Sequence, residues 1–213
     1  MTDCNEFCFT DTRAALDAAF GQAQVPLGWA DTPSTRPPGE PIRPTNRATL
    51  LRPIDPAHPR AGLEGLEIRW WMVPAFHKGP VADWRTLCTN ARVETLDTAP
   101  IFRNAYRARR GLVPLTAFIA YGEPPGWKKG QPKMRHAVTW GDPSLRYVAA
   151  LWETSHPADL PDGLESFALV SGPAGPDVQP LQDRAPAILT LDQGLAWLDL
   201  DGPGAAAVAA PAP

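Results

Sequence analysis

The chain has 213 residues, of which 44% are hydrophobic, with a formal net charge of −3. This length suits one domain with a substantial core. No apolar run approaches the roughly 20 residues of a membrane span, and the acidic balance excludes a generally basic nucleic-acid-binding protein. No signal peptide opens the chain, so we expect a cytoplasmic protein. The three cysteines (Cys4, Cys8 and Cys88) cannot all pair and lack zinc-like spacing, which favours reduced thiols, no metal and no cofactor.

The first predicted element is a helix that Thr10 and Asp11 cap and that runs through Phe20 to a stop at Gly21. Residues 33–62 are rich in proline, which excludes a long helix there. Within them, Ala48–Arg52 is the most strand-like stretch. Apolar runs that are too short for helices then follow between turn residues and favour a β-rich core. These runs are Glu67–Val73, Leu112–Ala120, Tyr147–Leu151 and Phe167–Val170.

Two further helices are predicted in the second half of the chain. Thr98–Arg110 is helical in pattern and should start near Ala99 and Pro100, since proline suits a first helical turn. Leu191–Leu198 should form a short helix that ends at a turn over residues 201–203. The last residues, 203–213, are mostly alanine and proline with little to bury. We therefore expect a single domain over residues 1–202 and a disordered tail over 203–213.

Positive charge is concentrated locally even though the chain is acidic. Arg103, Arg107, Arg109 and Arg110 fall within eight positions with no acidic residue among them. A solvated helical face is one interpretation. A phosphate-contacting patch is the other, because cations follow a nucleic-acid backbone while aromatic rings stack on bases. The neighbouring blocks with Trp70, Trp71 and Arg92 favour the second.

Several short blocks resemble, in this order, those of the SOS-response-associated peptidase (SRAP) family, whose members recognise abasic sites in single-stranded DNA. The similarity covers most of residues 4–198. The blocks are Cys4–Phe7 with Thr10, Ile42–Thr45, Arg69–Pro74, Asn90–Thr95, Phe102 with Arg103, Arg109–Pro114, Ala149–Glu153 and Asp183–Leu189.

The resemblance implies an α+β fold with a mostly antiparallel, β-barrel-like core, peripheral helices and a DNA-binding cleft. It implies single-stranded or abasic-site DNA as the partner of a monomeric protein in the response to DNA damage. It also implies catalytic positions at Cys4 and Asn90. Phosphate contacts would fall to Arg92, Arg103 and Arg184, base stacking to Trp70 and Trp71, and a sugar contact to Asn90.

The family's reaction needs an amino-terminal cysteine, whose amine and thiol together close a thiazolidine ring on the aldehyde of an abasic site. An asparagine, a glutamate and a histidine position the sugar and move protons. Here Met1-Thr2-Asp3 precede Cys4, so its nitrogen is acylated. The glutamate position holds Ala120, and the histidine position holds Gln182, which cannot titrate near neutrality. Trp71 replaces a glycine.

Three functions follow from this pattern. The leading hypothesis is a protein that binds single-stranded or abasic-site DNA while its crosslinking and self-processing chemistry is impaired. The second is an active crosslinking enzyme whose Cys4 is exposed by amino-terminal processing. Separately, Glu123, three residues after Ala120, is a candidate to replace the missing carboxylate. The third is a repurposed module in which the old cleft binds a protein or small ligand and Trp71 fills the DNA path.

Overall fold

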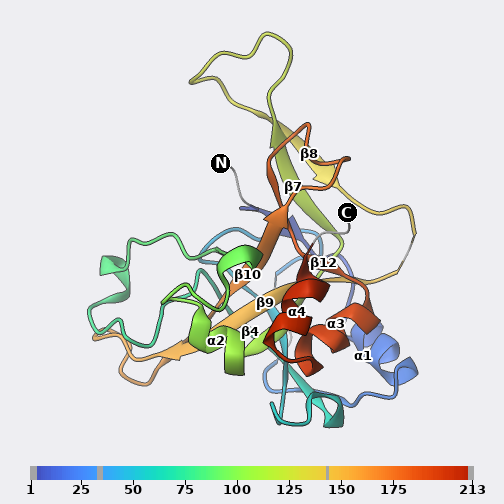
Figure 1. The fold of residues 1–213 in the computed structure, drawn as a ribbon, viewed down its shortest axis with the longest axis vertical. Coiled ribbons are helices and arrows are strands. Elements are labelled where there is room, and N and C mark those ends of the chain that lie inside the picture. The colour runs from blue at the N-terminus through green and yellow to red at the C-terminus, as the bar shows by residue number, and fades with distance from the viewer. Residues whose placement is uncertain (1–3, 33–35, 143, 211–213) are drawn as a thin grey trace.

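A closed five-stranded barrel forms the centre of the computed structural model, which describes residues 4–32, 36–142 and 144–210 (Figure 1). Antiparallel pairing runs in the order β4–β3–β6–β9–β10, and parallel pairing of β10 with β4 closes the ring. The strands are β3 (Arg47–Pro53), β4 (Leu63–Trp70), β6 (Arg110–Leu115), β9 (Arg146–Ser155) and β10 (Leu164–Pro173). The mixed, mostly antiparallel β-barrel fold is therefore confirmed.

Shorter strands extend the barrel and build a second sheet at one end. β2 (Leu27–Trp29) pairs with β4, β5 (Asn90–Arg92) and β11 (Arg184–Pro186) pair with β10, and β12 (Ile188–Leu189) pairs with β9. The second sheet has the order β1 (Phe7–Cys8), β7 (Ala117–Gly122) and β8 (Met134–Val138). Its β7–β8 hairpin projects away from the rest of the molecule (Figure 1).

Strand alternation divides the buried side chains between two cores. Leu66, Ile68 and Trp70 of β4 belong to the inner cluster, which fills the barrel, because alternate residues of a strand face opposite sides. The outer cluster takes the opposite faces of the same strands, as Ala149 and Leu151 of β9 illustrate. Residues of β1 and β7 join the inner cluster, so the second sheet covers one end of the barrel.

The helices cover the outer core. They are α1 (Arg13–Gln22), α2 (Arg103–Ala108), α3 (Leu191–Asp199) and α4 (Gly202–Ala209), with 3₁₀ turns at Pro59–Ala61, Val81–Asp83 and Val93–Thr95. Trp197 of α3 is fully buried and donates from Nε1 to the Gly111 carbonyl of β6, 3.0 Å away. That hydrogen bond holds α3 against the barrel.

The helices and strands predicted from the sequence occur where they were predicted, but their bounds differ in the structure. The helix expected from Thr10 begins later, because the Thr12 hydroxyl caps it by accepting from the Ala15 amide. The helix expected over Thr98–Arg110 is reduced to α2, since residues before it form turns and Arg110 already starts β6. The run Leu112–Ala120 contains parts of two strands, β6 and β7.

The disordered tail expected over residues 203–213 was wrong where the structure describes it. Asp201 caps α4 by accepting from the Gly204 amide at 3.0 Å, and a proline stands in its first turn. Ala205 and Ala209 are buried in the outer core. Small side chains permit this close packing, so an alanine-rich composition did not prevent folding. Residues 211–213 lie outside the described part.

Gly111 should be intolerant of any side chain because β6 passes close to β3. A Cβ atom there would lie 2.9 Å from Leu50 Cδ1 and 3.0 Å from the Leu51 carbonyl oxygen. We expect Gly111→Ala to lower the free energy of unfolding by about 1–3 kcal/mol through overpacking. Urea denaturation measures this change. Gly28→Ala in β2 is the matched control, since its Cβ would meet no atom within 4 Å; equal losses in both variants would contradict the packing argument.

Candidate functional site

Cys4 lies at the covered end of the barrel, where an asparagine from a distant strand holds it. Cys4 is fully buried, and its carbonyl accepts a hydrogen bond from Asn90 Nδ2 at 2.8 Å. The same amide nitrogen lies 3.2 Å from the hydroxyl of Thr89. The other Asn90 atom, Oδ1, is buried and has no hydrogen-bond partner among the described residues. The two positions expected to be catalytic are therefore adjacent, and one unsatisfied acceptor lies beside them.

Trp70 packs beneath these residues as part of the inner core. Its ring is fully buried, makes an edge contact with Phe7 at 5.1 Å and stacks on Phe167 at 6.4 Å between centroids. Its Nε1 donates to the Thr89 carbonyl at 2.9 Å. The whole ring is thus enclosed within the protein, so Trp70 supports the strand that carries Asn90 and offers no surface to a base in this conformation.

Trp71 is partly exposed and adopts a backbone conformation that suits glycine. Its φ is +102°, in a region where a bulky side chain is an outlier. This explains physically why glycine is favoured at the position, and the structure therefore stores strain there. The Trp71 ring is anchored by Nε1, which donates to the Thr86 carbonyl at 2.9 Å. A partly exposed, anchored indole is available for stacking.

The arginines predicted to contact phosphate differ in exposure. Arg92 in β5 and Arg103 in α2 are exposed. Arg184 is buried, its two terminal nitrogens each donate to the Glu94 carboxylate at 2.9 Å, and one also donates to the Ser171 carbonyl at 2.8 Å. Hydrogen bonds from Arg184 outweigh burial and hold the pKa of Glu94 below its ordinary value. Arg184 thus joins β10 and β11 to the turn after β5.

The two positions at which the resemblance implies a glutamate and a histidine lie near each other and carry no titratable group. Ala120 is fully buried in the inner core. Gln182 is also buried; its Nε2 donates to the Arg184 carbonyl at 2.7 Å, and its Oε1 accepts from the Tyr121 amide at 3.4 Å. Glu123, the candidate substitute for the carboxylate, is exposed and forms an ion pair with Lys133 at 2.9 Å.

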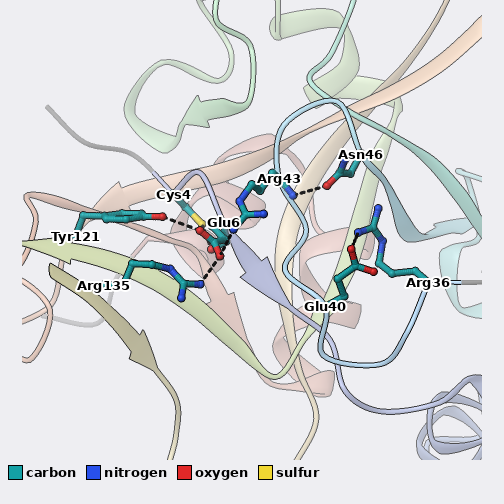
Figure 2. A network of polar contacts seen from close by, with 8 residues as sticks. All are labelled: Cys4, Glu6, Arg36, Glu40, Arg43, Asn46, Tyr121 and Arg135. Atoms are coloured by element: carbon teal, nitrogen blue, oxygen red, sulfur yellow. Dashed lines mark hydrogen bonds and ion pairs between the residues drawn. The ribbon is translucent and has the colours of Figure 1, made fainter. Parts of the chain in front are cut away.

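A buried carboxylate that the sequence did not mark out lies two residues from Cys4. Figure 2 shows Glu6 with Tyr121, Arg43 and Arg135 around it. Only 2% of its side chain is exposed; Tyr121 donates its hydroxyl at 2.6 Å, Arg43 lies at 3.2 Å, and Arg135 forms a further ion pair. The Cys4 thiol points to the Glu6 carbonyl at 3.6 Å. The signal in the sequence that could have pointed to this group was a charged residue two positions after Cys4. The partners of Glu6 come from three distant segments.

The other cysteines are poorly suited to nucleophilic chemistry. Burial raises the pKa of Cys88 to about 11, and burial together with the charge of Glu6 raises the pKa of Cys8. Both thiols therefore stay protonated at neutral pH, and the thiolate is the reactive form. Within the described ranges no disulfide joins the cysteines, and no group of three or more His, Cys, Asp or Glu side chains could hold a metal ion.

The described helices include none that is long and apolar enough to cross a membrane.

The charge of Glu6 should make stability depend on pH in the acid range. Burial raises the pKa of this carboxyl, but hydrogen bonds from Tyr121 and Arg135 and the charges of Arg135 and Arg43 outweigh it, so the pKa lies below the ordinary 4.5. The resulting stability is present above pH 4.5 and is lost as pH falls through the lowered value.

We therefore expect Glu6→Gln to lower the free energy of unfolding by about 1.5–3 kcal/mol at pH 7, the range for hydrogen bonds to charged groups. Because protonation removes the same charge from the natural protein, the difference between the two proteins should shrink below pH 4.5. Urea midpoints measured at pH 7 and pH 3.5 test this expectation. A difference that stays constant with pH would mean that the buried carboxyl is not ionised.

Comparison with known proteins identifies relatives across almost the whole chain. The family model described as SOS response associated peptidase (SRAP) matches residues 4–212. A crystal structure of a Bacteroides thetaiotaomicron protein is similar with a TM-score of 0.79 and 17% identity, covering 98% of this chain and 87% of that one. A Bordetella bronchiseptica protein gives 0.76 and 19%, covering 99% and 95%.

A phage-related protein from Bordetella bronchiseptica is also similar, with a TM-score of 0.68, 17% identity and coverage of 97% of this chain and 87% of that chain. At such identities these likenesses establish a shared fold. A search of curated protein sequences found no significant match.

Proposed function

Because the chain belongs to the SRAP family, which indicates a DNA-associated function, we propose that it binds single-stranded DNA, including DNA with an abasic site, at the part of its surface nearest to Asn90 and the buried Cys4. The observation that carries this proposal is the contact between Asn90 and Cys4. The amide nitrogen of Asn90 holds the Cys4 carbonyl, while its buried Oδ1 has no hydrogen-bond partner in the described chain. An unsatisfied buried acceptor costs about 1–3 kcal/mol, so a ligand donor that reaches Oδ1 through a movement of the Asn90 side chain is favoured. The hydroxyl groups of an abasic sugar are such donors.

The charged and aromatic groups singled out in the sequence suit a single strand. Arg92 follows Asn90 by two residues on β5 and is exposed, as is Arg103 on α2. Guanidinium groups neutralise phosphates, and a partly exposed indole such as Trp71 stacks on bases regardless of sequence. Trp70 and Arg184 support these groups from within the protein: Trp70 holds Thr89 beside Asn90, and Arg184 holds Glu94 beyond Arg92.

We further propose that the covalent chemistry is impaired. Ring closure needs an amine on the same residue as the thiol, and Cys4 follows Asp3 through a peptide bond. The methyl group of Ala120 and the amide of Gln182 can neither accept nor donate a proton near neutral pH. Glu123 is tied to Lys133 on the exposed hairpin, which places it poorly for the role of the missing carboxylate. We therefore expect the protein to bind an abasic site without forming a lasting covalent bond to it.

Binding to a fluorescent single-stranded oligonucleotide should weaken with salt, because each phosphate contact releases counterions. We expect Arg92→Ala and Arg103→Ala each to weaken binding and to reduce the slope of log K against log salt by about 0.7, the value for one phosphate of a single strand. Fluorescence anisotropy over a salt series measures both quantities.

Arg60→Ala is the matched control, because it removes the same charge from an exposed residue in the turn between β3 and β4. Salt-insensitive binding, or none, would remove the DNA proposal. Affinity that is unchanged in the Arg92 and Arg103 variants would favour a protein or small ligand as the partner.

Incubation with abasic-site DNA followed by a denaturing gel should show no shifted band for the full chain. Intact mass gives the mature amino terminus in the same sample. A variant that lacks residues 2 and 3 and loses its methionine presents Cys4 with a free amine; because Ala120 and Gln182 still cannot move protons, we expect slow capture at most. A rapid covalent band from the full chain would support the processed-enzyme hypothesis instead.

A further inference from the structure

The network around Glu6 has a property that a purely structural ion pair does not require. It combines two guanidinium groups with one carboxylate, so it carries a net positive charge while Glu6 is ionised. Glu6 is 2% exposed, whereas the side chains of Arg43 and Arg135 are 59% and 50% exposed. The negative charge is thus inside the protein, and both positive charges extend from it to the surface.

Burial of a carboxylate is costly unless it is paired and hydrogen-bonded. Tyr121 and the two arginines satisfy Glu6, and in return they fix the position of each guanidinium. Two guanidinium groups held in this way are pre-organised, which reduces the conformational entropy lost when they bind a ligand. Each guanidinium carries five N–H donors in a rigid fork, and half or more of each side chain remains open to solvent.

Segments that are distant in sequence form this network next to Cys4. Glu6 follows Cys4 by two residues and lies just before β1. Arg43 belongs to the segment before β3, where Ile42 bridges to Phe7 of β1, and Arg135 lies on β8. Figure 2 shows Arg43 and Arg135 approaching Glu6 from opposite sides, with Cys4 beside it. The backbone of Cys4 is meanwhile held by Asn90, so the chain passes from the Asn90 contact directly to the arginine network.

The geometry points to a phosphate clamp: Arg43 and Arg135, positioned by Glu6, bind a phosphodiester of a DNA strand next to the nucleotide that lies at Cys4. This inference rests on the proposed DNA binding and adds the contact on the Glu6 side of Cys4, while Arg92 lies on the Asn90 side. The forked geometry of guanidinium suits two phosphate oxygens at once. Glu6 is a positioning residue in this arrangement and does not touch the ligand.

Salt-dependent binding of a single-stranded oligonucleotide by the full chain tests the clamp. Arg43→Ala and Arg135→Ala should each lower the slope of log K against log salt by about 0.7 and weaken binding several-fold at low salt. Each single variant leaves Glu6 with Tyr121 and the other arginine, and a melting curve checks that it folds. Arg60→Ala again serves as the control with equal charge change. A structural role alone would lower the melting temperature and leave the slope unchanged.

Oligonucleotides in which one phosphate is replaced by a neutral methylphosphonate locate the contact. In the natural protein, neutralising the clamped phosphate should reduce affinity; in Arg43→Ala/Arg135→Ala the same replacement should have no further effect. If that double variant does not fold, Glu6→Gln/Arg43→Gln/Arg135→Gln removes all three charges while retaining hydrogen-bonding groups. A titration with inorganic phosphate at constant ionic strength tests whether the site binds free phosphate. If it does, inorganic phosphate should displace the oligonucleotide.

The outcomes separate this inference from the function on which it rests. If the natural protein binds DNA with a salt-dependent affinity that Arg92→Ala reduces, while Arg43→Ala and Arg135→Ala do not change the slope, the clamp is refuted and DNA binding stands. If no phosphate position is coupled to the two arginines, the clamp is likewise refuted. Absence of salt-dependent binding by the natural protein refutes both. Displacement by inorganic phosphate with no coupled position would assign the site to a free anion.

Discussion

The position of β10 is the constraint on which the rest of the structure depends. This strand pairs with four others: β9 and β11 in antiparallel register, and β4 and β5 in parallel register. Its pairing with β4 closes the barrel, so no long edge is left between them. Its pairing with β5 places Asn90 beside Leu169, and its pairing with β11 places Arg184 beside Pro173. One buried strand thereby assembles the site from segments almost 100 residues apart.

The site contains side chains that position other groups in place of side chains that transfer protons. The amide nitrogen of Asn90 and the terminal nitrogens of Arg184 donate to Cys4, Glu94 and Ser171, while Ala120 and Gln182 present a buried methyl group and a buried amide. The carboxylate present near Cys4, that of Glu6, is held by three donors that lower its pKa despite burial. An ionised carboxylate tied to two arginines organises charge and is a weak proton donor at neutral pH.

The backbone conformation of Trp71 explains what it means physically to have a tryptophan at this position. The sequence showed only that an indole stands where glycine is usual. The positive φ shows that the position favours glycine for conformational reasons, so the large side chain is kept at an energetic cost. Its anchored and partly exposed ring then fits either a stacking surface or a plug, and both remain consistent with one geometry. Trp70, adjacent in sequence, differs completely because strand alternation turns it into the core.

The sequence by itself determined the family resemblance, the barrel strands with strong apolar patterns and the helix that carries Trp197, because each depends on local pattern and block order. It misjudged the last helix, since short alanine-rich segments acquire stability only from packing on a core. It also missed the partners of Glu6, because Arg43, Tyr121 and Arg135 meet it through contacts between segments 37 to 129 residues away. Tertiary structure alone decided which arginines are buried supports and which reach solvent, because residue type fixes charge while only packing fixes exposure.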